Sequence, residues 1–106
     1  MGDEVVVMIT ASSSEEAAKI GRALVEERLV ACASIVGGVR SLFFWDGRTR
    51  DEQETLMICK SRSVLMDGIV DRVKQLHSYS VPEIIALPVV AGSKEYLDWV
   101  KETATG

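Results

Sequence analysis

The stretch VACASIVGGVRSLFFWDGR, Val30 to Arg48, decides the fold. It is strand-like over an unusual length, is interrupted at Gly37-Gly38, and reaches an Asp46-Gly47 pair of the kind that makes tight hairpin turns. After that turn, TLMICK, Thr55 to Lys60, predicts a returning strand. The sequence therefore predicts a long β-hairpin whose arm, Val39 to Trp45, projects beyond the rest of the domain.

A strand and a helix are expected ahead of this hairpin. EVVVMI, Glu4 to Ile9, is a continuous apolar run and predicts a strand buried on both faces. Ser13 and Glu16 have the spacing of a capping box, which marks the start of a helix. The helix is expected to run to about Arg28, with one apolar stripe made of Ala17, Ile20 and Leu24.

A second helix is expected after Ser61 or Ser63, and it ends near Ser78-Tyr79 because Pro82 biases the preceding residue away from helical geometry. Its buried stripe consists of Leu65, Ile69, Val73 and Leu76. IIALPVVAG, residues 84 to 92, then predicts a strand with an edge position or a bulge at Pro88.

A short helix closes the chain, begun by Ser93 and carrying Tyr96, Trp99 and Val100 on one side. The predicted order is β-α-β-β-α-β followed by this helix. That order is typical of the α+β, ferredoxin-like split βαβ arrangement, with two helices on one face of a four-stranded antiparallel sheet. Residues 1–106 form a single domain by length.

Composition excludes several classes of protein. The formal net charge is −4, and the few arginines of the hairpin are offset by neighbouring carboxylates, so a nucleic-acid partner is not expected. No apolar run is long enough to span a membrane. The start MGDEVVV has no basic segment or cleavage site, so a cytoplasmic location is expected. Cys32 and Cys59 are expected to be free thiols.

The strands are apolar on both faces of the predicted sheet, and the two helices that pack on it cover only one of them. VVVMI, CASIV, LFFW, LMIC and IIALPVV are apolar at successive positions, so both faces of the sheet carry apolar side chains. Two helices cover only one face. Either the chain is a monomer with exposed apolar residues, or sister copies cover the second face. Burying about 1,000 Å² of apolar surface contributes on the order of 25 kcal/mol before association costs, which favours a homo-oligomer.

The segment LHSYSVPEIIALP, Leu76 to Pro88, holds the one histidine, His77, together with Tyr79, Glu83 and both prolines. His77 lies at a helix end, where it either bonds terminal carbonyls or serves as a metal or ligand contact. Cys32 is either a buried apolar residue or a ligand, and Lys60 either reaches solvent or places a cation in a pocket.

Trp45 either packs on a neighbouring copy or stacks on a ligand.

No sequence motif supports a catalytic function. There is no Gly-rich phosphate loop and no Ser-His-acid set. Arg40 in GGVRS resembles the phosphate-binding loop of small phosphatases only weakly, because it lies in a predicted strand. The protein is therefore not expected to be an enzyme.

Five separated motifs together resemble the CutA family of divalent-cation tolerance proteins along nearly the whole chain: ALVEERLVAC, GGVRSLFFWDG, LMICKSR, LHSYSVPEIIALPVVAG and YLDWV. The resemblance implies a ferredoxin-like homotrimer, with exchanged hairpins and a cleft between subunits. It also implies binding of copper or another divalent metal ion in the cytoplasm and a role in metal tolerance.

The resemblance implies roles for particular residues. The metal ligands would be His77, Cys32 and Glu83. The ligand cleft would be lined by Trp45, Lys60, Tyr79 and Trp99. The chain departs from the family at Ile9, where some members have a metal-binding cysteine, and at Ser78, which replaces the proline after the histidine.

Two other functions stay open. One is a trimeric small-molecule sensor resembling the nitrogen-regulatory signal proteins, in which Lys60, Glu83 and Trp45 would receive an anionic or amphipathic metabolite. The other is a rigid trimeric scaffold for a partner protein.

Overall fold

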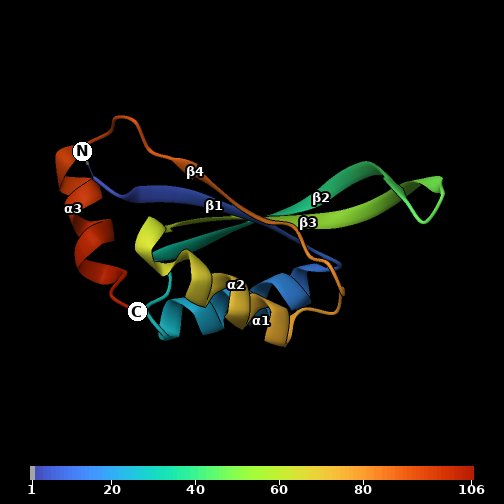
Figure 1. The fold of residues 1–106 in the computed structure, drawn as a ribbon, viewed down its shortest axis with the longest axis horizontal. Coiled ribbons are helices and arrows are strands. Elements are labelled where there is room, and N and C mark those ends of the chain that lie inside the picture. The colour runs from blue at the N-terminus through green and yellow to red at the C-terminus, as the bar shows by residue number, and fades with distance from the viewer. Residues whose placement is uncertain (1) are drawn as a thin grey trace.

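A computed structural model describes residues 2–106 and shows four strands and three α-helices (Figure 1). The strands are β1 (Glu4–Ala11), β2 (Cys32–Trp45), β3 (Arg48–Arg62) and β4 (Ile84–Pro88). The helices are α1 (Ser14–Glu26), α2 (Met66–Leu76, preceded by the short 3-10 turn η1, Ser63–Leu65) and α3 (Lys94–Thr103).

The strands form one antiparallel sheet in the order β2-β3-β1-β4. This is the strand order of a ferredoxin-like fold, so the predicted fold class is confirmed. Helices α1 and α2 lie together on one face of the sheet (Figure 1). Over residues 2–106, no second layer of this kind covers the other face.

The core lies between the sheet and these two helices. Alternate residues of β1 face it, so Val7 and Ile9 are fully buried, and Met57 and Cys59 do the same from β3. The helix stripes are confirmed, because Ile20 and the other predicted apolar positions of α1 and α2 are buried or packed against this cluster. The local period of apolar residues therefore set the helix faces correctly.

The predicted N-cap of α1 is confirmed, but the capping box is not reciprocal. Ser13 Oγ accepts a hydrogen bond from the Glu16 backbone N–H at 3.1 Å. The Glu16 side chain does not return to Ser13. It accepts instead from the backbone N–H and the hydroxyl of Ser12, one residue earlier, at 2.9 and 2.8 Å.

The hairpin has the predicted turn, and the interruption expected at Gly37-Gly38 takes the form of a bulge. Asp46 and Gly47 both have positive φ, 52° and 77°, which is the conformation of a two-residue hairpin turn that suits strand twist. Gly38, at φ 72°, sits in the register shift between Val36 and Val39, where a bulge needs a left-handed residue. The arm projects past the helices and makes the molecule 44 Å long against 25 and 22 Å in the other directions (Figure 1).

Three expectations need correction. Strand β1 is not buried on both faces in the single chain, because its residues alternate between buried and half-buried. Strand β4 ends at Pro88 rather than continuing to residue 92. The returning strand β3 is longer than TLMICK, since it pairs with β2 from Arg48 onward. The first change reflects the uncovered second face.

The second face exposes large apolar side chains along the sheet. Val36, Ile85 and Leu87 are 44%, 49% and 50% exposed. Helix α3 covers only the end of the sheet far from the hairpin tip, where Val100 and Ala104 pack on Ala31 (Figure 1). None of the helices described over residues 2–106 is long and apolar enough to cross a membrane.

Candidate functional site

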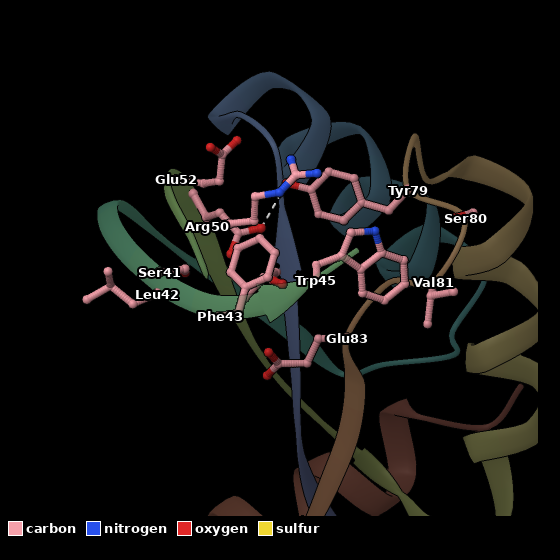
Figure 2. Close-up of a pocket in the computed structure, with 12 residues that line it drawn as sticks. Ser41, Leu42, Phe43, Trp45, Arg50, Glu52, Tyr79, Ser80, Val81 and Glu83 are labelled. Atoms are coloured by element: carbon pink, nitrogen blue, oxygen red, sulfur yellow. Dashed lines mark hydrogen bonds between the residues drawn. The ribbon is translucent and has the colours of Figure 1, made fainter. Parts of the chain in front are cut away.

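A hollow of the described chain lies along the hairpin arm. This pocket has a volume of about 570 Å³ and lies between the arm, the end of β1 and the loop from α2 to β4. One face of the arm forms one wall of the pocket. It carries the side chains of two cross-strand pairs, Phe43 with Arg50 and Ser41 with Glu52. Figure 2 shows Phe43 and Trp45 lying between Arg50 and Glu83.

The pocket is rich in charge. Carboxylates of Glu52, Glu54 and Glu83 and one guanidinium, Arg50, line it. The Tyr79 hydroxyl donates a hydrogen bond to Glu54 Oε2 at 2.8 Å. Burial and this bond to a carboxylate raise the pKa of Tyr79 well above its usual value, so Tyr79 keeps its proton and remains a donor.

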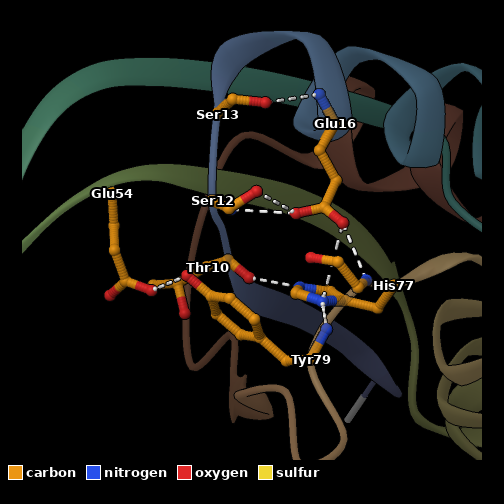
Figure 3. A network of polar contacts seen from close by, with 8 residues as sticks. Thr10, Ser12, Ser13, Glu16, Glu54, His77 and Tyr79 are labelled. Carbon is orange, nitrogen blue, oxygen red and sulfur yellow. Dashed lines mark hydrogen bonds and ion pairs between the residues drawn. The ribbon is translucent and has the colours of Figure 1, made fainter.

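His77 lies next to the pocket, in a polar network that includes the pocket residue Tyr79 (Figure 3). Its side chain is 0% exposed. Nε2 lies 2.7 Å from the Thr10 carbonyl oxygen, and Nδ1 accepts from the Tyr79 backbone N–H at 3.0 Å. A carbonyl only accepts and an amide N–H only donates, so these partners fix the neutral tautomer with hydrogen on Nε2. Both ring nitrogens are therefore in use.

The topology explains why Thr10 needs this bond. The Glu4 carbonyl accepts from the Val89 N–H at 3.1 Å, so even-numbered residues of β1 point their backbone groups toward β4. Strand β4 starts only at Ile84, which pairs with Ile9. The Thr10 carbonyl thus lies just past the end of β4, and the His77 ring replaces the missing strand partner.

Glu16 ties the same loop to α1. Glu16 Oε2 accepts from the Ser78 N–H at 2.7 Å and lies 3.9 Å from His77 Nδ1. Burial raises the pKa of Glu16, but the hydrogen bonds from Ser12 and Ser78 outweigh burial and lower the pKa to about 2. The carboxylate is therefore ionised and holds the loop in place.

A second group of predicted site residues lies elsewhere, near α3. Cys32 Sγ is 3.6 Å from the Tyr96 hydroxyl, and Cys32 pairs with Lys60 across the sheet. The Tyr96 and Trp99 rings lie 5.6 Å apart. The hydrogen bond to Cys32, with burial, raises the pKa of Tyr96 to about 12.

The structure therefore divides the predicted site residues into two groups. Trp45, Tyr79 and Glu83 share the pocket, with His77 behind it, whereas Cys32, Lys60 and Trp99 lie toward the α3 end. Lys60 pairs with Val6 of β1, and His77 bonds Thr10 of the same strand. Val6 and Thr10 are four residues apart, so the two groups are separated by about 13 Å along β1. Over residues 2–106, no three His, Cys, Asp or Glu side chains come together as a metal site.

Some pocket residues were not predicted from the sequence. Thr10, Phe43, Arg50, Glu52 and Glu54 line the pocket, yet the sequence indicated only that the charges of the hairpin offset one another. The sequence carried no alternating signal for the charged ones, because every residue from Arg48 to Glu54 is polar, so the face that each side chain takes follows only from the register of the hairpin.

Comparison with known proteins places this geometry in context. A family model described as CutA1 divalent ion tolerance protein matches residues 5–103. A divalent-cation tolerance protein CutA of Thermus thermophilus is 48% identical over 93% of this chain and 96% of its own. The solved structure of that relative has a TM-score of 0.92, with 94% of this chain and 97% of the other covered.

Two further relatives differ in the location that their names give. A structure described as a periplasmic divalent cation tolerance protein CutA from Archaeoglobus fulgidus is 42% identical, with a TM-score of 0.92 over 95% of this chain and 98% of that one. The protein CutA 1, chloroplastic, of Oryza sativa is 37% identical over 93% of this chain, which spans 56% of the rice protein.

Proposed function

This chain belongs to the CutA1 family of divalent ion tolerance proteins, and we propose that it acts in divalent-cation tolerance as a non-catalytic homotrimer in the cytoplasm. The observation that carries the assembly is the uncovered second face of the sheet. Large apolar side chains on β2 and β4, including Val36, Ile85 and Leu87, are about half exposed there.

The arm supports the same proposal. Leu42 and Phe44 are 65% and 73% exposed. Phe44 is not among the residues that line the pocket, whereas Leu42 lies at the edge of its lining. Exposed apolar strands of this length pair with other chains unless they are covered. Sister copies that cover the second face and the arm would bury both surfaces together, and the number three follows from the family resemblance.

Sedimentation equilibrium tests this assembly. We expect a particle of about three times the 11.6 kDa chain mass that persists on dilution to micromolar concentration. A well-behaved particle of 11.6 kDa would contradict it.

We propose copper, or another divalent ion, as the metal, with His77, Cys32 and Glu83 as its ligands. The residues of one chain do not fit such a site, because they lie apart and both His77 nitrogens are engaged. Metal binding therefore requires ligands from more than one copy, and His77 would have to give up the Thr10 carbonyl or the Tyr79 N–H.

Calorimetric titration with Cu²⁺, and with Zn²⁺ as an ion that does not oxidise thiols, tests these ligands. We expect Cys32→Ser and Glu83→Gln each to weaken binding about tenfold. Glu95→Gln on α3 is the control and should not change the affinity. Equal affinities for the wild type, Cys32→Ser and Glu83→Gln would remove both residues from the site.

The pocket favours a second candidate function, a small-molecule sensor. A hollow of about 570 Å³ with aromatic and charged lining has the size and composition of ligand sites. The sensor would use Trp45, Tyr79 and Glu83, without Lys60 and Trp99. A thermal-shift series of metals against metabolites separates the candidates, because only a true ligand raises the melting temperature progressively as its concentration rises above the dissociation constant.

A further inference from the structure

The pocket carries an excess of negative charge. Three carboxylates face one guanidinium, and Lys60, the cation expected to attract an anion, lies at the other end of the sheet. An anionic metabolite would enter against this field, whereas a cation would reduce it.

The carboxylates are not equivalent. Glu54 accepts from the Tyr79 hydroxyl, and Glu52 lies two residues from Arg50 on the same face of the arm. Glu83 projects from the opposite wall, is exposed, and forms no ion pair with any of the described residues 2–106 (Figure 2). Glu52 is also exposed and in no ion pair among the described residues, but it lies on the same arm face as Arg50, whose cation offsets its charge. Glu83, on the other wall, is therefore the carboxylate that a cationic ligand would meet without a competing guanidinium.

Aromatic faces occupy the space between the two walls. Phe43 and Trp45 are 40% and 49% exposed, and Tyr79 borders the same hollow. Aromatic faces attract ammonium groups and also cover an apolar body. Rings grouped with a free carboxylate make up the recognition chemistry of an organic cation.

We propose that this pocket binds an organic amine: an ammonium group paired with Glu83, carrying an apolar or aromatic body that packs on Phe43 and Trp45. This inference rests on the sensor function and names its class of ligand. It differs from the anionic or amphipathic metabolite proposed from the sequence in the charge of the ligand, because Lys60, the cation of that proposal, lies outside this pocket.

The guanidinium of Arg50 determines which way round the amine binds. Its Nε is buried without a hydrogen-bond partner, and the guanidinium occupies the wall opposite Glu83. An ammonium group is repelled by this end of the pocket, so the amine points toward Glu83 and the body toward the rings. A polar acceptor on the far end of the body would contact Arg50.

Calorimetric titration of the intact protein in EDTA tests the proposal with three probes of one shape: 2-phenylethylamine, 2-phenylethanol and 3-phenylpropionate. We expect the amine to bind at least about tenfold more tightly than the other two, with an affinity that falls as salt is raised. Glu83→Gln should remove the preference for the amine while leaving the alcohol unchanged.

Matched variants separate the pocket from the rest of the surface. Phe43→Leu should weaken all three probes several-fold, whereas Phe44→Leu, the next residue on the opposite face of the arm, should not. Glu95→Gln is the control for Glu83→Gln.

Equal affinities for the three probes, an unchanged preference in Glu83→Gln, or no binding up to about 10 mM would each overturn the proposal. Particle mass is measured on the same samples and copper binding on samples without EDTA. Failure of the amine site is therefore distinguishable from failure of the assembly or of metal binding.

Discussion

His77 Nε2 donates a hydrogen bond to the Thr10 carbonyl oxygen at 2.7 Å, between residues 67 positions apart in the sequence. Thr10 lies where β1 extends beyond the end of its partner strand β4. His77→Ala should leave this part-buried carbonyl and the Tyr79 N–H without their partners. Each unpaired group costs roughly 1–3 kcal/mol, so we expect the free energy of unfolding to fall by about 3 kcal/mol. Urea denaturation measures the loss. Lys94→Ala, an 88% exposed side chain, is the control and should change stability by less than about 0.5 kcal/mol. Equal stabilities would show that the histidine is not structural.

Glu16 makes stability depend on pH in the acid range. Its pKa is lowered from 4.5 to about 2 in the folded chain, so its stabilisation is complete above about pH 4.5 and is lost as pH falls toward 2. Glu16→Gln should therefore destabilise the protein at pH 7, by about 2 kcal/mol for the lost charged hydrogen bonds, and by progressively less in acid. Thermal unfolding from pH 7 to 2.5 measures the difference. Glu15→Gln, in the same first turn but exposed, should change stability only slightly at every pH, and a difference for Glu16→Gln that does not shrink in acid would contradict the assignment.

The sequence predicted those features that depend on local chemistry. The Asp46-Gly47 turn, the interruption of the strand at Gly37-Gly38 and the helix stripes follow from backbone preference and period, and all are present. Of the two alternatives left open for His77, bonding to terminal carbonyls of its own helix is not what the structure shows, and the role as a metal or ligand contact stays a prediction. The ring bonds the Thr10 carbonyl instead, and this free carbonyl at the end of β1 is created only when the sheet assembles.

The candidate site was predicted only in part for the same reason. Residues of the hairpin and of the loop before β4 were named individually, but the resemblance gave no distances between them. Register places Cys32 and Lys60 level with Val6, while Trp45, Tyr79 and Glu83 meet at the other end of β1. Strand register is a property of the whole sheet, so residue identity alone could not separate the two groups.

Arg28 closes α1 with an unfavourable backbone conformation. Its φ is 61°, and its N–H bonds the Val25 carbonyl at 3.0 Å, as in a left-handed helix cap that favours glycine. Arg28→Gly should raise the free energy of unfolding by about 0.5–1 kcal/mol. Arg22→Gly, the same change inside α1, should lower it by about 1 kcal/mol, so the two variants compared by urea denaturation have opposite signs. A loss of stability in both would contradict the cap.

The uncovered sheet face makes a prediction that separates assembly from folding. Ile85 on β4 is 49% exposed on the second face, whereas Val25 is 38% exposed on α1, on the covered side. In the single chain the two positions are alike in exposure, so a glutamate at either place should cost folding little. If sister copies cover the second face, Ile85→Glu buries an unpaired charge at each contact and costs several kcal/mol of association energy. We expect Ile85→Glu to lower the particle mass measured by light scattering, and Val25→Glu to leave it unchanged. Circular dichroism should report the same helix and strand content for both at low temperature. An assembly that survives Ile85→Glu would place the contact elsewhere, on the arm alone.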